Sequence, residues 1–224
     1  MPMSLNAVLK IGGSLGRGDG LEALCREIRR LGERYRILVV PGGGEFADQV
    51  RTAATRFKLS ETTAHCMALC AMDQYGYLLH HMIAGSYLTA DLPSACQATE
   101  AGKVSILLPS TPVLQYSGLP HSWHVTSDTI SAWVTRQADC RRLVLLKDVD
   151  GLLGTAPAKE FPSALIPELT LDQLAAHSGG VDEYLSCYLA SAPLETWVIN
   201  GLYPERITEL LEKGHTAGTR ISCS

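Results

Sequence analysis

The sequence lacks the features that would place a protein in a membrane, on nucleic acid or outside the cell. No run of apolar residues approaches the roughly 18 that a membrane-spanning helix needs. The net charge is −4 and no long basic stretch occurs. A general nucleic-acid-binding protein needs a cationic surface, so this charge balance argues against one. The first residues, Met-Pro-Met-Ser-Leu-Asn, lack the basic and apolar regions of a signal peptide. We therefore expect neither a membrane nor a nucleic acid as partner.

Cysteine is present without a pattern that would give it a structural role. The seven cysteines are an odd number, are widely scattered and include no CxxC pair. They predict reduced thiols in a cytoplasmic protein. His121 and His124 have HxxH spacing, but no helical pattern supports a metal site there, and we assign no residue as a metal ligand.

What the sequence does contain is an alternation of strand and helix patterns. The 224 residues, 46% of them hydrophobic, suffice for one large domain or two small lobes. Strands are predicted at residues 7–11, 36–40, 103–108, 143–147, 196–200 and 219–222. Helices are predicted at 21–35, 45–56, 59–83, from 127 onward, and at 171–177, 181–190 and 203–213. This alternation predicts a layered α/β fold with a mostly parallel sheet.

A lysine and a glycine turn end the first predicted strand. Lys10 lies near its carboxyl end, and Gly12, Gly13 and Ser14 follow. Glycine lets a backbone turn sharply, and successive N–H groups in such a turn form an anion-binding concavity. The segment is therefore either a phosphate site or an ordinary glycine turn from which Lys10 reaches water.

A second glycine turn follows the second predicted strand. Gly42, Gly43 and Gly44 lead directly into a helix, whose free N–H groups and dipole favour an anion. Gly42, Gly44 and Ala47 also match the dinucleotide pattern GxGxxG/A. That pattern needs a strand ending in Asp or Glu about 20 residues later, whereas a helix is predicted there.

Two places carry carboxylates where they could act on a ligand. Asp128 lies in the first turn of the helix that Thr126 or Ser127 begins; it either complements the helix dipole, holds a metal or orients phosphate-binding lysines. The strand at 143–147 ends in Lys147, and the turn Asp148-Val149-Asp150-Gly151 follows. Open α/β sheets bind ligands at the carboxyl ends of their strands.

Four stretches, taken together and in this order, resemble the amino-acid kinase superfamily, which includes acetylglutamate, carbamate, uridylate and isopentenyl phosphate kinases. They are Leu9–Ser14, Val40–Glu45, Thr126–Ile130 and Lys147–Gly151. The resemblance implies a three-layer αβα sandwich with a mainly parallel central sheet. It implies one domain over residues 1–224, with an acceptor lobe at about 1–122 and a nucleotide lobe at about 123–224. It also implies ATP and Mg²⁺ as cofactors and a homo-oligomer.

The resemblance assigns roles to the residues of these motifs. Lys10 contacts the transferring phosphoryl group, and Gly12 and Gly13 donate N–H groups to it, with Ser14 beside them. Asp128 orients the lysine and the Mg²⁺ environment. The residues expected to border the nucleotide are Asp148, Asp150 and Gly151, and those expected to hold the acceptor are Gly42, Gly43, Gly44 and Ser127. Phosphoryl transfer depends mainly on positioning and charge stabilisation, which these residue types supply.

One departure from the family pattern concerns a second lysine. Many relatives carry a catalytic lysine a few residues after a glycine pair in the C-terminal lobe. Here Gly179 and Gly180 precede a predicted helix and provide a third candidate phosphate site, but no lysine follows them before Leu185. Either Lys147 replaces the missing lysine as a third catalytic residue, or activity is weak.

The acceptor is predicted from a closer resemblance. Residues 41–47 and 123–128 look most like the small kinases of methanofuran biosynthesis, which phosphorylate [5-(aminomethyl)furan-3-yl]methyl phosphate. Glu45 and Asp48, one helical turn apart, either meet the aminomethyl cation or only complement the helix dipole. The alternatives are an isopentenyl phosphate or UMP kinase, and a non-catalytic protein of this fold that binds nucleotides or oxoanions.

Overall fold

The computed structural model describes residues 5–154, 164–177 and 179–223, and its centre is one eight-stranded sheet. The strand order is β3-β4-β2-β1-β5-β7-β8-β6. The strands are β1 (Ala7–Ile11), β2 (Ile37–Pro41), β3 (Tyr87–Thr89), β4 (Ser105–Leu107), β5 (Arg142–Lys147), β6 (Glu168–Thr170), β7 (Glu195–Asn200) and β8 (Thr219–Ser222). Every pair of neighbours is parallel except β7 and β8. The predicted mainly parallel sheet is confirmed.

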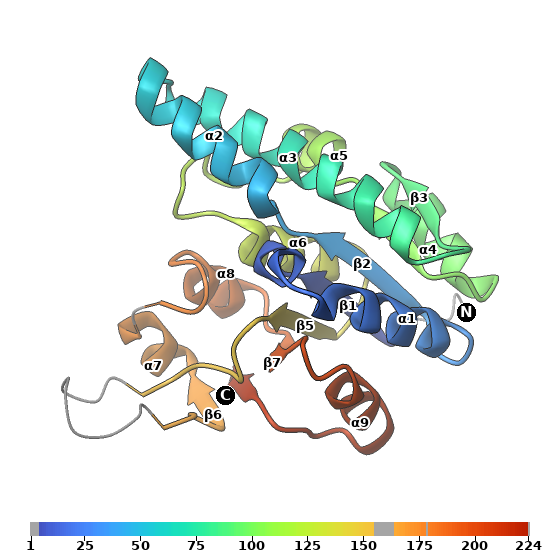
Figure 1. Cartoon of the computed structure of the whole chain (residues 1–224). Coiled ribbons are helices and arrows are strands. Elements are labelled where there is room, and N and C mark those ends of the chain that lie inside the picture. Colours follow the sequence, from blue (N-terminus) through green and yellow to red (C-terminus); the bar gives the residue numbers. More distant parts are fainter. Residues whose placement is uncertain (1–4, 155–163, 178, 224) are drawn as a thin grey trace.

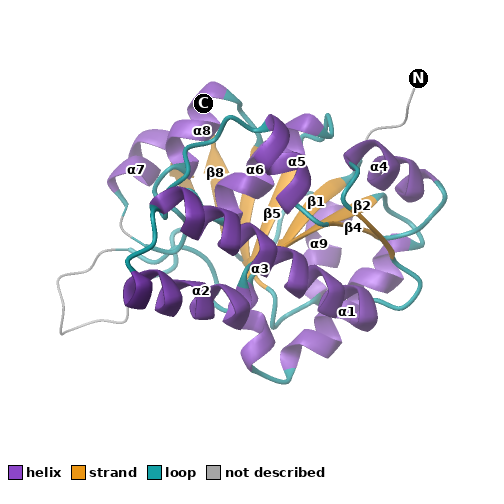
Figure 2. Ribbon diagram, turned by 90° about the horizontal axis from the view of Figure 1, so that it is seen from above, coloured by secondary structure: helices purple, strands orange, loops and turns teal. Residues whose placement is uncertain are grey.

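Helices cover both faces of this sheet (Figures 1 and 2). They are the 3₁₀ helix η1 (Gly13–Arg17), α1 (Gly20–Gly32), α2 (Gly44–Phe57), α3 (Glu61–Met82), α4 (Leu92–Glu100), α5 (Ser110–Tyr116), α6 (Ser127–Gln137), α7 (Leu171–Ala176), α8 (Leu185–Ser191) and α9 (Glu205–Lys213). One buried cluster joins the sheet to α1, α9 and the second half of α3. Another joins it to the helices from α4 to α8. The three-layer αβα sandwich is therefore confirmed.

The two central strands place their lysines on the same side of the sheet. In β1, Leu9 and Ile11 belong to the cluster with α1 and α9, and Val8 belongs to the cluster with α6. Successive side chains of a strand point to opposite faces, so Lys10 lies on the α6 side with Val8. Lys10 is in register with Leu145 of β5, which packs on the α6 side, and Lys147 is two residues further along. Strand alternation and the register between β1 and β5 together direct both lysines toward α6.

Three short elements between residues 87 and 116 were not predicted. Strand β3 is a three-residue edge strand that pairs only with β4, and α4 connects the two. Helix α5 begins at Ser110, whose backbone N–H and hydroxyl donate hydrogen bonds to the carboxylate of Asp73 on α3. This contact caps the first turn of α5 from a different helix, so no local pattern announces it.

The predicted helix over residues 181–190 is wrong at its start. Helix α8 begins at Leu185, and Gly179 and Gly180 have φ values of 87° and 85° in an irregular segment. Left-handed backbone cannot continue into a right-handed helix, and the side chain of Asp182 is occupied by contacts with α6. Gly179 and Gly180 therefore do not lie at a helix N-terminus, and the helix dipole supports no anion site there.

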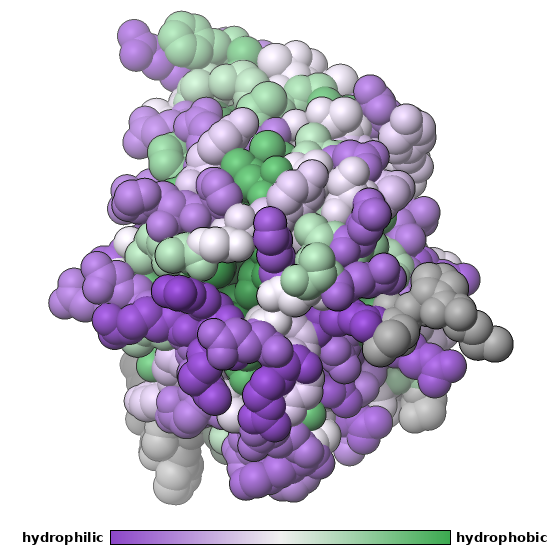
Figure 3. All heavy atoms as spheres, turned by 90° about the vertical axis from the view of Figure 1, so that its right-hand side faces the viewer, coloured by the Kyte–Doolittle hydropathy of each residue, from purple (hydrophilic) through white to green (hydrophobic). Residues whose placement is uncertain are grey.

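The surface and the helices of the described residues can be compared with what a membrane-spanning segment requires. On the face drawn in Figure 3, hydrophilic residues cover most of the area, with smaller hydrophobic areas between them. Across the described ranges, no helix combines the length and the apolar character that a membrane crossing requires.

Candidate active site

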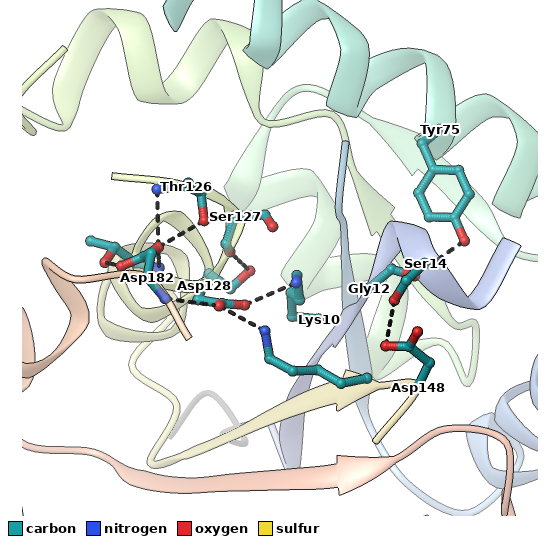
Figure 4. Close-up of polar contacts among 12 residues, drawn as sticks. Lys10, Gly12, Ser14, Tyr75, Thr126, Ser127, Asp128, Asp148 and Asp182 are labelled. Atoms are coloured by element: carbon teal, nitrogen blue, oxygen red, sulfur yellow. Dashed lines mark hydrogen bonds and ion pairs between the residues drawn. The ribbon is translucent and has the colours of Figure 1, made fainter. Parts of the chain in front are cut away.

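Two lysines from neighbouring strands meet one buried carboxylate at the carboxyl end of the sheet (Figure 4). The ammonium nitrogen of Lys10 lies 2.9 Å from Oδ1 of Asp128, and that of Lys147 donates to Oδ2 at 2.8 Å. The side chains of Lys10, Asp128 and Lys147 are 6%, 4% and 15% exposed. Both oxygens of Asp128 are therefore paired with ammonium groups. Of the three roles left open by the sequence, this geometry favours the orientation of lysines.

Burial and charge act against each other in this cluster. Burial alone would raise the pKa of Asp128, but the charges of Lys10 and Lys147 bring that pKa well below its usual value. Burial lowers the pKa of Lys10, the nearby charge of Lys147 lowers it further, and Asp128 offsets these effects only in part. The site thus keeps its carboxylate ionised while making one of its lysines easier to deprotonate.

The two glycine turns that follow β1 and β2 lie directly against each other. A Cβ atom on Gly13 would come within 2.1 Å of both Cα and N of Gly44, which is too close for any side chain. Gly44 has φ of 55°, in the left-handed region that glycine adopts without strain. Glycine at these two positions therefore lets the turns touch and form a continuous backbone surface beside Lys10.

One expectation about the first turn is wrong. The N–H of Gly12 donates to the carbonyl of Leu146 at 2.8 Å, and the N–H of Gly42 donates to the carbonyl of Ile11 at 2.9 Å. These two amides tie the turns to the sheet, so the Gly12 amide is not directed at a phosphoryl group as the family resemblance implied. The buried hydroxyl of Tyr75, which sequence reasoning missed, lies 3.5 Å from the Gly12 carbonyl and supports the turn from α3.

The turn after β5 reaches the first glycine turn through one hydrogen bond. The hydroxyl of Ser14 donates to Asp148 at 2.8 Å. Asp150 points elsewhere, because it accepts from Arg206 at 2.7 Å and from Asn200 at 3.2 Å. These bonds, with the close approach of Gly151 to Thr219, join the β5 turn to α9, β7 and β8.

A cavity opens beside the glycine turns, between α2, α3 and the start of α6. Its lining includes Gly13, Ser14, Arg17, Gly43, Gly44, Asp48, Arg51, His65, Ser122, Trp123, Thr126 and Ser127. Of the predicted acceptor residues, Gly43, Gly44, Asp48 and Ser127 are on that lining, whereas Gly42 and the exposed Glu45 are not. The structure therefore separates Glu45 from Asp48, which the sequence had placed together.

The Asp48 carboxylate accepts hydrogen bonds from two arginines that the sequence had not identified as site residues. Arg17 from η1 donates to Oδ2 at 2.5 Å, and Arg51 from α2 donates to Oδ1 at 2.9 Å. The Arg51 guanidinium also lies 4.8 Å from the centre of the Trp123 ring. The i, i+3 spacing of Asp48 and Arg51 on a predicted helix could have indicated their ion pair. Arg17 lies 31 residues from Asp48 in the sequence, so no local pattern indicates that contact. With two guanidinium groups and one carboxylate, these three side chains together carry positive charge.

A histidine pair lies at the edge of the same cavity. The rings of His65 and His121 stack with centroids 4.8 Å apart. Burial, and secondarily the neighbouring His121, lower the pKa of His65, which favours the neutral imidazole. Its Nε2 atom is buried without a hydrogen-bond partner in the described part of the chain.

Comparison with known proteins agrees with this architecture. The pattern of the amino acid kinase family matches residues 7–192. A [5-(aminomethyl)furan-3-yl]methyl phosphate kinase from Methanocaldococcus jannaschii is 29% identical over 218 residues, which cover 96% of each chain. A uridylate kinase from Thermococcus kodakarensis is 24% identical over 216 residues, or 91% of each chain.

Among solved structures, the uridylate kinase of Archaeoglobus fulgidus superimposes with a TM-score of 0.75 at 22% identity. The alignment covers 96% of this chain and 99% of that enzyme, so the two share a fold over their whole length. The family pattern spans the glycine turns, both lysines and Asp128. This chain belongs to the amino acid kinase family and is an ATP-dependent phosphotransferase.

Proposed function

We propose that this kinase transfers the terminal phosphoryl group of ATP to the phosphate of [5-(aminomethyl)furan-3-yl]methyl phosphate and releases ADP and a diphosphate. The observation that carries the proposal is the pairing of Lys10 and Lys147 with one buried carboxylate, beside two touching glycine turns and a positively charged cavity. An oxygen of the acceptor phosphate forms a new bond to the γ-phosphorus of ATP. The bond between this γ-phosphorus and the ADP oxygen breaks. No covalent intermediate with the protein is needed.

In this proposal Lys10 and Lys147 stabilise the charge on the phosphoryl group in transit. They lie on the sheet between the first glycine turn and α6, and Asp128 holds both in place. Fixed ammonium groups in a site with little water stabilise developing negative charge strongly. Residues 123–224, with the turn Asp148 to Gly151 and the segment at Gly179 and Gly180, form the lobe that we assign to ATP.

Arg17 and Arg51 support a phosphate-bearing acceptor in the lobe formed by residues 1–122. Both guanidinium groups line the cavity next to Gly43 and Gly44. Arginine pairs well with phosphate because its planar group offers several donors. Asp48 holds the two arginines at 2.5 Å and 2.9 Å, and we assign it to orienting them rather than to binding an amine.

The aminomethyl end of the acceptor is assigned to Ser122, Ser127 and His65, which also line the cavity. The unpartnered Nε2 of a neutral His65 would accept a hydrogen bond from an amine. The similarity to the Methanocaldococcus jannaschii enzyme over 96% of each chain supports this acceptor over UMP.

Magnesium enters this proposal with the nucleotide. No group of three His, Cys, Asp or Glu side chains is placed to hold a metal ion within residues 5–154, 164–177 and 179–223, and Asp128 has both oxygens paired with lysines. The residues of the site therefore fit a Mg²⁺ ion that is coordinated by ATP phosphates and by water molecules, as is usual in kinases. When bound, Mg²⁺ would neutralise phosphate charge.

We further infer that the enzyme is a homo-oligomer and is cytoplasmic. Light scattering tests the oligomeric state, and cell fractionation tests the location.

The test compares acceptors that differ in one group. We expect kcat/KM for the aminomethylfuran phosphate to exceed that for the same furan phosphate without the aminomethyl group by about tenfold to a hundredfold, because a site built for a polar group penalises its loss. UMP and isopentenyl phosphate serve as the other acceptors, and ADP release is measured for each. Equal use of the amine-free phosphates would contradict the assigned acceptor and leave the kinase assignment intact.

A further inference from the structure

Asp182 binds the first turn of α6 from a distant part of the chain (Figure 4). One of its oxygens accepts from the backbone N–H groups of Thr126 and Thr129, each at 2.9 Å, and from the Thr126 hydroxyl at 3.0 Å. Its other oxygen accepts from the Thr129 hydroxyl at 2.5 Å. The first N–H groups of a helix have no partner within the helix, so a carboxylate in this place acts as a cap supplied from outside.

The same residue also contacts the catalytic carboxylate through its backbone. The N–H of Asp182 lies 3.3 Å from Oδ2 of Asp128, the oxygen that accepts from Lys147. Asp128 lies on α6 between Thr126 and Thr129, the two residues that the Asp182 side chain holds. Asp182 thus restrains both the helix turn that carries Asp128 and one oxygen of Asp128 itself.

We propose that Asp182 is a positioning residue for phosphoryl transfer, which keeps Asp128 between Lys10 and Lys147 and adds a second negative charge beside them. The proposal rests on the proposed function of the two lysines. It gives a role to the segment after Gly180, where the family pattern led us to expect a lysine. In this chain the segment contributes an anion that organises two lysines supplied by the strands.

The charged groups that face Asp182 decide the sign of its electrostatic effect. They are Asp128 on α6 and Lys10 on β1. Burial, and then the charge of Asp128, raise the pKa of Asp182. The charge of Asp182 in turn favours the protonated form of Lys10. Removal of that charge should therefore make Lys10 lose its proton at a lower pH.

The first test uses Asp182→Asn, with Glu183→Gln as the matched control. Glu183 is the next residue, is exposed and pairs with His124 at the surface, so its replacement removes the same charge away from the lysines. We expect Asp182→Asn to lower kcat by about tenfold to a hundredfold, since small displacements of catalytic groups act on that scale. The alkaline limb of its pH–kcat profile should also move to lower pH. Glu183→Gln should leave both quantities unchanged.

Thr129→Val separates the bracing role of Asp182 from its charge. This change removes the hydroxyl that donates to Oδ1 of Asp182, at nearly constant volume, and keeps the carboxylate. It should lower kcat without moving the alkaline limb. If thermal melts show that Asp182→Asn is unfolded, kcat is measured for Thr129→Val and Asp182→Glu instead. Wild-type kcat in both of these variants would overturn the proposal.

A titration of the lysine side chains by NMR tests the charge effect without any acceptor. Lysine resonances in ¹³C- and ¹⁵N-labelled protein are assigned with Lys10→Arg and Lys147→Arg, and the pKa of each is measured in wild type and in Asp182→Asn. A lower Lys10 pKa in the variant supports the proposal, and an unchanged one overturns it. Because this readout needs no turnover, a failure of the assigned acceptor would leave it unaffected.

Discussion

The ammonium nitrogen of Lys147 lies 2.8 Å from Oδ2 of Asp128, whose other oxygen, Oδ1, pairs with Lys10. The sequence raised the possibility that Lys147 replaces a lysine absent after Gly180, and the geometry brings it to the carboxylate that also holds Lys10. Two lysines from adjacent strands therefore share one buried anion.

Lys147→Ala should raise the KM for ATP and lower kcat by about a hundredfold, the scale observed when one stabilising donor is removed from a catalytic site. The variant should fold, because Lys10 and the N–H of Asp182 still pair with the buried Asp128 carboxylate. Lys213→Ala, which removes an exposed lysine from α9, is the control and should have wild-type kinetics. Wild-type turnover in folded Lys147→Ala would show that a different cation acts on the phosphates.

The pH dependence of turnover should report Lys10. Burial and the charge of Lys147 lower the pKa of Lys10 below its usual value of 10.5. Because the protonated form stabilises phosphoryl charge, activity should be full below this lowered pKa and should fall as pH rises through it. Lys10→Arg, whose guanidinium stays charged, should lose this alkaline limb even at reduced kcat. The measurement is kcat at saturating substrates between pH 6 and pH 10.5, with melting temperature recorded at each pH.

Gly13→Ala should abolish detectable turnover. The added methyl group would lie 2.1 Å from the backbone of Gly44, so the two glycine turns would be forced apart. Gly18→Ala is the matched control, because nothing lies within 4 Å of a Cβ at that position, and it should retain activity. Circular dichroism would verify that both variants fold. An active Gly13→Ala enzyme would mean that contact between the turns is unnecessary for catalysis.

Arg51→Ala should raise the KM for the acceptor by about tenfold or more and leave the KM for ATP unchanged. A hydrogen bond between charged groups contributes about 1.5–3 kcal/mol, which corresponds to a factor of this size. Arg56→Ala, an exposed arginine on the same helix, provides the control. Steady-state kinetics with each substrate varied in turn would distinguish the two. A change confined to the KM for ATP would place the acceptor outside this cavity.

Much of the site followed from local patterns in the sequence. The apolar runs of β1 and β5 predicted buried strands, and each run carries a lysine near its carboxyl end. The glycine turns at the strand ends and the helix start before Asp128 were also readable, because backbone conformation there depends on nearby residues. The layered fold and the positions of Lys10, Lys147 and Asp128 at the ends of these elements are therefore largely properties of the sequence.

Other features depend on which distant segments lie side by side. Asp182 caps a helix turn 53 residues earlier in the chain, Arg17 reaches Asp48 across 31 residues, and Asp73 starts α5 across 37 residues. A carboxylate can accept hydrogen bonds from any donor that packing brings near it, so local periodicity does not identify its partner. The sequence by itself determined the central strands, the glycine turns and the positions of the lysines near strand ends. Only the tertiary structure decided which carboxylate orients lysines, which holds arginines and which braces α6, because each depends on contacts made after the elements pack.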